Sequence, residues 1–105
     1  MMAEENYVKL EIGVSKVLRF DKYAYQPRQV IDPQLGFQKT VNALVFHVTE
    51  VDGTPADTVF SLISEKAKKE FLPYLAGERF RRYKFVVIRE AGDFTAPRIM
   101  SAISV

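Results

Sequence analysis

The chain contains no cysteine and a single histidine, His47, among its 105 residues. Without cysteine it can form no disulfide, use no thiol nucleophile and bind no metal through sulfur. The absence of cysteine fits a reducing compartment, so we expect a soluble cytoplasmic protein. No apolar run approaches the roughly 20 residues of a membrane-spanning helix, and residues 1–6 lack the apolar core of a signal peptide. We therefore expect no membrane partner, and a disordered or frayed N-terminus over residues 1–6.

Few residues are of the kinds that perform catalysis. His47 lies within an apolar stretch, where a histidine on a strand face or in the core is the more common role, and acid–base catalysis needs a partnered group with a tuned pKa. Glu50 and Asp52 stand two positions apart beside a glycine turn, where carboxylates more often face water than a metal. No serine lies in a nucleophile-elbow context, and no glycine-rich phosphate loop is present. We expect no enzyme activity, no catalytic residue, no metal site and no cofactor.

The composition is that of an ordinary globular protein, with 48% hydrophobic and 27% charged residues. Fifteen basic and 13 acidic residues give a formal net charge of +2. This near balance does not by itself indicate a polyanionic partner, so evidence for one must come from the positions of the charges. No repeat or linker divides the chain, and residues 1–105 are expected to form one domain.

Alternating and β-rich segments predict strands on both sides of a single helix. The first is long, residues 7–31, with Gly13 at a bend and Pro27 at an edge or a break. A turn at residues 32–36 follows, and Asp52-Gly53 is a strong hairpin signal. The predicted strands cover residues 7–31, 37–51, 58–63, 83–90 and 97–105.

An amphipathic helix is predicted over residues 64–76. Ser64 is a good N-cap, Glu65 lies in the first turn, and Gly77 provides a stop. The apolar stripe of this helix consists of Ala67, Phe71, Leu72 and Leu75, and its water-facing residues are Lys66, Lys68, Lys69 and Glu70.

The order of three strands, one helix and two strands resembles the oligonucleotide/oligosaccharide-binding (OB) fold. This resemblance in element order implies a mainly β protein, a small five-stranded antiparallel barrel with one helix between the third and fourth strands. Two other architectures are less consistent with the order. An SH3-like barrel usually lacks such a helix at this place, and a pleckstrin-like sandwich has its helix at the C-terminus.

The OB resemblance implies binding of single-stranded DNA or RNA across the second and third strands. Such binding uses aromatic rings on which bases stack and basic side chains that neutralise phosphates. Two clusters interleave these residue types, one within residues 19–39 and one within residues 79–84. The predicted nucleic-acid contacts are Arg19, Tyr23, Tyr25, Arg28, Phe37, Lys39, Arg82 and Arg98.

Each of these residues also has a structural role that the sequence leaves open. Aromatic residues on strands most often pack in the core or against a neighbouring strand, and the lysines of residues 66–69 are typical of a solvated helix face. The alternative function is a protein-interaction subunit. It would bind a protein partner, or a second copy as a homodimer, through an edge strand or the apolar hairpin of residues 31–37.

Overall fold

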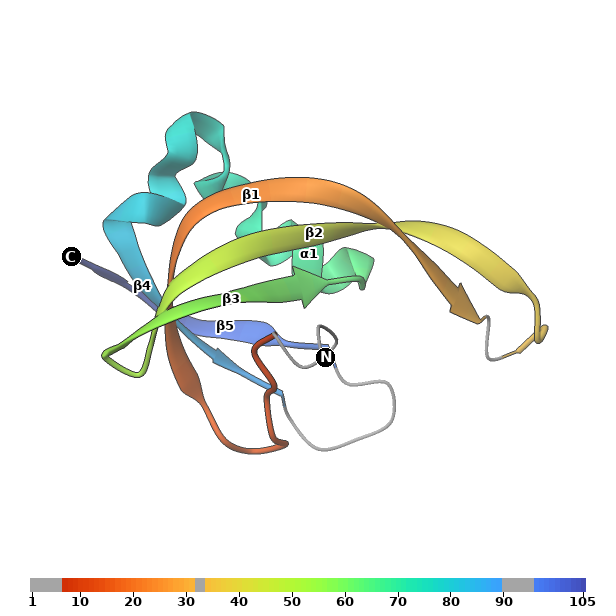
Figure 1. The fold of residues 1–105 in the computed structure, drawn as a ribbon, viewed down its shortest axis with the longest axis horizontal. Helices are drawn as coiled ribbons and strands as arrows, with labels where there is room; N and C mark the ends of the chain where they lie inside the picture. The colour runs from red at the N-terminus through yellow and green to blue at the C-terminus, as the bar shows by residue number, and fades with distance from the viewer. Residues whose placement is uncertain (1–6, 32–33, 90–95) are drawn as a thin grey trace.

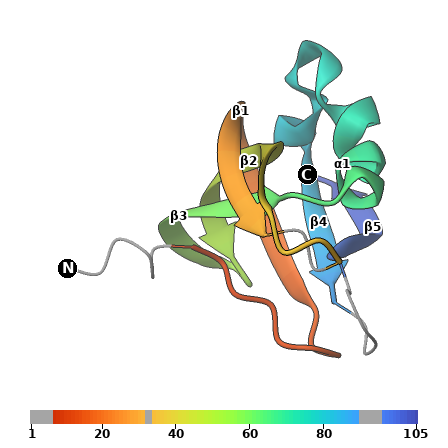
Figure 2. The ribbon, with the colours of Figure 1, turned by 90° about the vertical axis from the view of Figure 1, so that its right-hand side faces the viewer.

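The computed structural model describes residues 7–31, 34–89 and 96–105, and it shows a mainly β protein (Figure 1). Within these residues five antiparallel strands form one sheet in the order β3-β2-β1-β4-β5. A helical segment follows β3 and lies to one side of the curved sheet (Figure 2). The strands are β1 (Lys16–Ile31), β2 (Gln38–Val51), β3 (Thr54–Leu62), β4 (Tyr83–Ile88) and β5 (Arg98–Ser104).

The sheet is not closed within the described residues, so the predicted barrel is not confirmed. The prediction of a strand starting at residue 7 is also wrong, because β1 begins at Lys16. The segment before it makes one bridge to the edge of β3, at Val59, and another to Arg89 just after β4. Gly13, with a φ of +82°, turns the chain there. The segment therefore spans two distant strands and cannot form a continuous ladder with either.

The paired strands β1 and β2 extend well beyond the rest of the sheet (Figure 1). β1 pairs with β4 only over Lys16–Leu18, and β2 pairs with β3 only from Leu44 onward. Residues 26–31 and 38–43 therefore pair only with each other in the described structure, and we call this two-stranded projection the arm.

Phenylalanine rings form the centre of the core. Phe71, which lies on the helix and is fully buried, has its ring centroid between 5.2 and 6.3 Å from four others. The helix thus fills the concave side of the sheet with an aromatic residue, as its predicted apolar stripe requires. The four partner rings belong to Phe20, Phe46, Phe60 and Phe85.

The helical segment is less regular than predicted. The α-helix α1 covers only Glu65–Phe71, and two 3₁₀ helices follow, η2 (Leu72–Tyr74) and η3 (Ala76–Arg82). Ser64 is the N-cap, as predicted, and its Oγ accepts from the Ala67 N–H at 3.4 Å. Pro73 explains the early end of α1, because its ring clashes with the carbonyl four residues earlier in an α-helix. Leu72, which was predicted to belong to the apolar stripe, is exposed as a result.

Lys68 was predicted to face water, but it is buried because its side chain bonds to a backbone group of β2 just beyond the last pair of β2 and β3. Leu44 pairs with Leu62, so further pairing would place residue 64 opposite Asn42. The chain enters α1 there instead, and Lys68 Nζ donates to the Asn42 carbonyl at 2.7 Å. A lysine side chain thus supplies the hydrogen bond that the next residue of β3 would otherwise make.

The same hydrogen bond shows how Pro27 is oriented in the arm. In antiparallel pairs the N–H and C=O of a residue point to the same side, and the side alternates along the strand. Since the Asn42 carbonyl points to the helix, Pro27, its partner in the pairing, directs its nitrogen away from β2. Proline has no N–H, so the open edge of β1 lacks one of the donors that an added strand would need.

Candidate nucleic-acid interface

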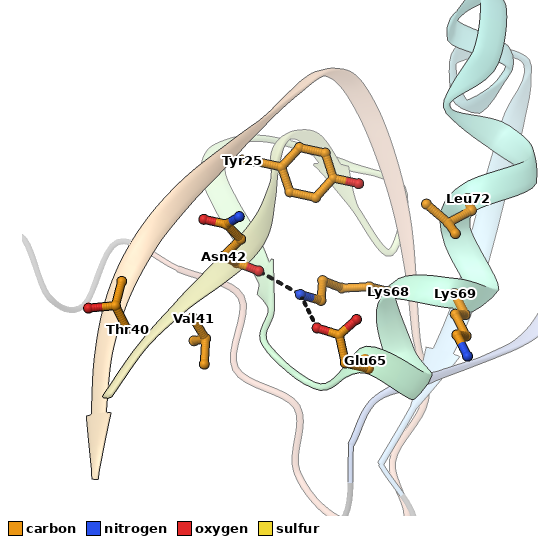
Figure 3. Close-up of a pocket in the computed structure, with 8 residues that line it drawn as sticks. All are labelled: Tyr25, Thr40, Val41, Asn42, Glu65, Lys68, Lys69 and Leu72. Atoms are coloured by element: carbon orange, nitrogen blue, oxygen red, sulfur yellow. Dashed lines mark hydrogen bonds and ion pairs between the residues drawn. The ribbon is translucent and has the colours of Figure 1, made fainter. Parts of the chain in front are cut away.

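A cleft of about 520 Å³ lies between the base of the arm and α1 (Figure 3). This volume is in the range of protein sites for small organic ligands, about 300–1,000 Å³. The helical residues of the cleft follow one face of the helix at i, i+3, i+4 and i+7. The strands contribute Tyr25, Thr40, Val41 and Asn42, and the helical segment contributes Glu65, Lys68, Lys69 and Leu72.

Two apolar side chains stand on opposite walls of the cleft. The Tyr25 ring projects from β1 toward the helical segment, and Leu72 lies across from it (Figure 3). They are 49% and 47% exposed, respectively. A half-exposed ring facing an open space can accept a second flat group against its face.

Two lysines line the cleft, and Lys68 extends into it whereas the Lys69 side chain points away from Glu65 (Figure 3). Lys68 Nζ lies between the Asn42 carbonyl and the Glu65 carboxylate, at 2.7 Å from each. The Lys68 side chain is only 10% exposed, whereas that of Glu65 is 82% exposed. The hydrogen bond and charge of Lys68 lower the pKa of the Glu65 carboxyl, and the charge of Lys69 lowers it further. The ionised form of the carboxylate is therefore stabilised mainly by Lys68.

Of the predicted aromatic contacts, Tyr25 lines the cleft and Tyr23 does not. The Tyr23 ring stands edge-on to Phe80, with centroids 5.7 Å apart, and edge-on to Tyr25 at 6.2 Å. Its exposed fraction is 36%, and much of its surface extends the core. Phe37 lies at the far end of the arm, just before β2, and is 69% exposed.

The structure places the predicted cations of the arm away from the tyrosines. Side chains alternate between the two faces of a strand, so Arg28 points to the face opposite Tyr23 and Tyr25. Lys39 pairs with Val30, two positions from Arg28, and shares the face of Arg28. The basic and aromatic residues of the first predicted cluster therefore lie on opposite faces of the same ribbon.

The remaining predicted cations are distributed over the body of the sheet. Arg19 is half-buried and pairs with Glu50. Arg82 precedes β4, whereas Arg98 pairs with Ile88 at the other end of that strand. At about 3.4 Å per residue, these two arginines are roughly 20 Å apart. The eight predicted residues thus do not form one surface, and only Tyr25 lines the cleft.

Lys68, Lys69 and Leu72 line the cleft but were not predicted as residues of a site. Their spacing carries a signal, because i, i+3, i+4 and i+7 from Glu65 define one helix face. The capping Ser64, two residues after the end of β3, also places the start of this helix beside the first half of β2. Both signals depend on the pairing of β2 with β3.

A second polar cluster surrounds His47 on the other side of the sheet from the phenylalanine core. Its Nδ1 is 2.7 Å from Asp21 Oδ1, and its Nε2 is 2.7 Å from Asp57 Oδ1. The hydrogen bond to Asp57 and then that to Asp21 raise the pKa of the imidazole above 6.5, against a smaller opposing effect of burial. The two carboxylates flank opposite ring nitrogens, and no group of three potential ligands in the described ranges could hold a metal ion.

This arrangement predicts a pH-dependent contribution to stability. Because the pKa of His47 is higher in the folded protein than in the unfolded chain, the contribution is complete below about pH 6.5. It is lost as the pH rises through the folded pKa. We expect the urea midpoint of the wild type to fall between pH 6 and 8.5 relative to that of His47→Gln. Asp57→Asn should reduce this difference, and parallel pH profiles for wild type and His47→Gln would contradict the prediction.

Comparisons with known proteins do not assign the fold or the cleft to a family. The chain matches no protein-family model, no curated protein and no solved structure. In the part of the chain that the structure describes, no helix combines the length and the apolar character needed to cross a membrane.

Proposed function

We propose that the protein is a non-enzymatic module that binds single-stranded DNA or RNA, with the cleft as its central contact. The main supporting observation is the half-exposed Tyr25 ring, opposite Leu72 in a cleft that Lys68 and Lys69 also line. Proteins that bind single strands with little sequence preference combine stacking on aromatic rings with cations along the phosphates. The cleft offers both within one volume.

The sheet topology also supports this proposal. β1 lies between β2 and β4, and the helical segment between β3 and β4 packs onto the concave side. The OB fold is a partly open five-stranded barrel that binds across its second and third strands, at the loop joining the first two. Here the arm lies at the corresponding end of β1 and β2, and the cleft at its base is lined by β1, β2 and the helical segment rather than by β3 (Figure 3).

The separation of side chains suggests which predicted contacts take part. Tyr25 and Lys69 would contact a nucleotide in the cleft, and Arg28, Lys39 and Phe37 would contact a strand that continues around the arm. The exposed fraction of Phe37 leaves its ring available for a base. Arg19, Arg82 and Arg98 do not line the cleft and have no role in this central contact.

Salt-dependent binding tests the proposal. With Lys68, Lys69, Arg28 and Lys39 on phosphates, the log–log slope of affinity against salt for a single strand is expected near −2.8, at about 0.7 per contact. Lys69→Ala should flatten the slope by about 0.7. Lys66→Ala removes the same charge from the same helix outside the cleft and should leave it unchanged. Fluorescence anisotropy with a labelled ten-residue oligothymidine at several salt concentrations measures these slopes.

A protein-interaction role is the second candidate, because the end of the arm is apolar. Ile31, Leu35 and Phe37 are each about two-thirds exposed, and exposed apolar clusters often mark protein contacts. The proline on the open edge of β1 argues against association by strand pairing, so the tip is the stronger candidate. If the wild type binds no oligonucleotide even at low salt, and sedimentation shows self-association that Phe37→Ser abolishes, this second function replaces the first.

A further inference from the structure

We propose that the Glu65 carboxylate occupies the position of a nucleic-acid phosphate, and that a bound strand displaces it from Lys68. The inference rests on the proposed function and specifies what the cleft recognises, a nucleotide with its phosphate. Two groups contact the Lys68 ammonium, the Asn42 carbonyl and the Glu65 carboxylate. The inference follows because the first is fixed in position and the second is not.

One acceptor of Lys68 is fixed and the other is free to leave. The Asn42 carbonyl belongs to the backbone of β2, so Lys68 is held in place whether or not Glu65 is present. The Glu65 carboxylate, in contrast, is at the end of a flexible side chain that is 82% exposed. The carboxylate of this pair faces water although the Lys68 side chain is only 10% exposed, so another anion can reach the position of the carboxylate from solvent.

The position of the carboxylate matches the requirements of a phosphate. Its oxygen is 2.7 Å from Lys68 Nζ, so this position already holds a negative charge against the ammonium group. A phosphate in the same place would meet the Lys68 ammonium group. Lysine is a common phosphate ligand, and a phosphate offers more acceptor oxygens than a carboxylate. The attached base would then reach the space between Tyr25 and Leu72.

The exchange predicts whether a mutation of Glu65 raises or lowers the affinity for the ligand. A carboxylate that competes with the ligand lowers its affinity, so removing the negative charge of Glu65 should strengthen binding. A purely structural ion pair predicts the reverse or no change. Charge removal elsewhere supplies a matched control, since Glu78 pairs with Arg81 at i, i+3 at 2.9 Å, outside the cleft.

The experiment compares Glu65→Gln and Glu78→Gln with the wild type by anisotropy with the labelled oligothymidine. Glu65→Gln is expected to tighten binding about two- to fivefold, as for the loss of one competing exposed ion pair, and Glu78→Gln to change it by less than about twofold. Unchanged or weaker binding by Glu65→Gln, with the wild type still binding, overturns the inference and leaves the proposed function standing. If neither protein binds at any salt concentration, both fall.

A second measurement separates phosphate from base. Thymidine monophosphate and thymidine are titrated into the wild type and Glu65→Gln, and amide shifts of cleft residues are followed by NMR. The monophosphate should bind more tightly than the nucleoside, and Glu65→Gln should strengthen only the monophosphate. Equal responses to the two ligands would show that the cleft does not bind phosphate and would overturn the inference.

Discussion

Replacing Phe71 with alanine is expected to lower the free energy of unfolding by about 3–5 kcal/mol. The side chain is fully buried and packs against four other phenylalanine rings. Its removal would leave a cavity lined by rings from several strands, which cannot all move inward to fill it. Because domains are typically stable by only about 5–15 kcal/mol, this one change removes a large fraction of the total.

Urea denaturation followed by far-UV circular dichroism measures this loss. Leu72→Ala is the matched control, because Leu72 is the next residue and is about half exposed. The control should cost less than about 1 kcal/mol, as is common for truncations away from the core. A loss below about 1 kcal/mol for Phe71→Ala would mean that α1 does not fill the concave side of the sheet.

Replacing Tyr25 with alanine is expected to weaken oligonucleotide binding by about 1–3 kcal/mol, or about 5- to 150-fold. The reason is the loss of a ring that lines the cleft and is about half exposed. Since the side chain is uncharged, the dependence of affinity on salt should remain nearly the same. Tyr25→Phe keeps the ring and should retain most of the affinity.

Tyr23→Ala distinguishes stacking from packing. Tyr23 contacts the Phe80 and Phe46 rings at the margin of the core, so its loss should lower stability more than affinity. Anisotropy titrations measure the affinity and urea midpoints the stability of the three variants Tyr25→Ala, Tyr25→Phe and Tyr23→Ala. If Tyr25→Ala binds as tightly as the wild type, or loses affinity only through unfolding, then the cleft is not where bases stack.

Much of the fold follows from local sequence signals. The Asp52-Gly53 pair predicts a two-residue hairpin, and both residues have positive φ, at 52° and 84°, as that turn requires. The Ser64 cap marks the start of α1. Both features depend on the conformation of one or two residues, which their side-chain chemistry favours.

Features that depend on strand pairing could not be read from the chain. Whether Arg28 shares a face with Tyr25 follows from the alternation along β1, but which face borders the helix depends on the pairing of β2 with β3. The burial of Lys68 has the same origin, since its acceptor is on a strand 26 positions away. Clusters of basic and aromatic residues in sequence are therefore poor evidence for a shared surface when they lie on a two-sided ribbon.

The position of β1 inside the sheet has a consequence for folding during synthesis. β1 is the first strand made, yet one of its neighbours is β4, which follows β3 only after residues 63–82. At about 5–20 residues per second, that interval lasts roughly 1–4 s. A nascent β1–β3 meander would present Phe46 and Phe60 on an uncovered apolar face throughout it. During this interval, we expect chaperones to bind the nascent chain at this uncovered face.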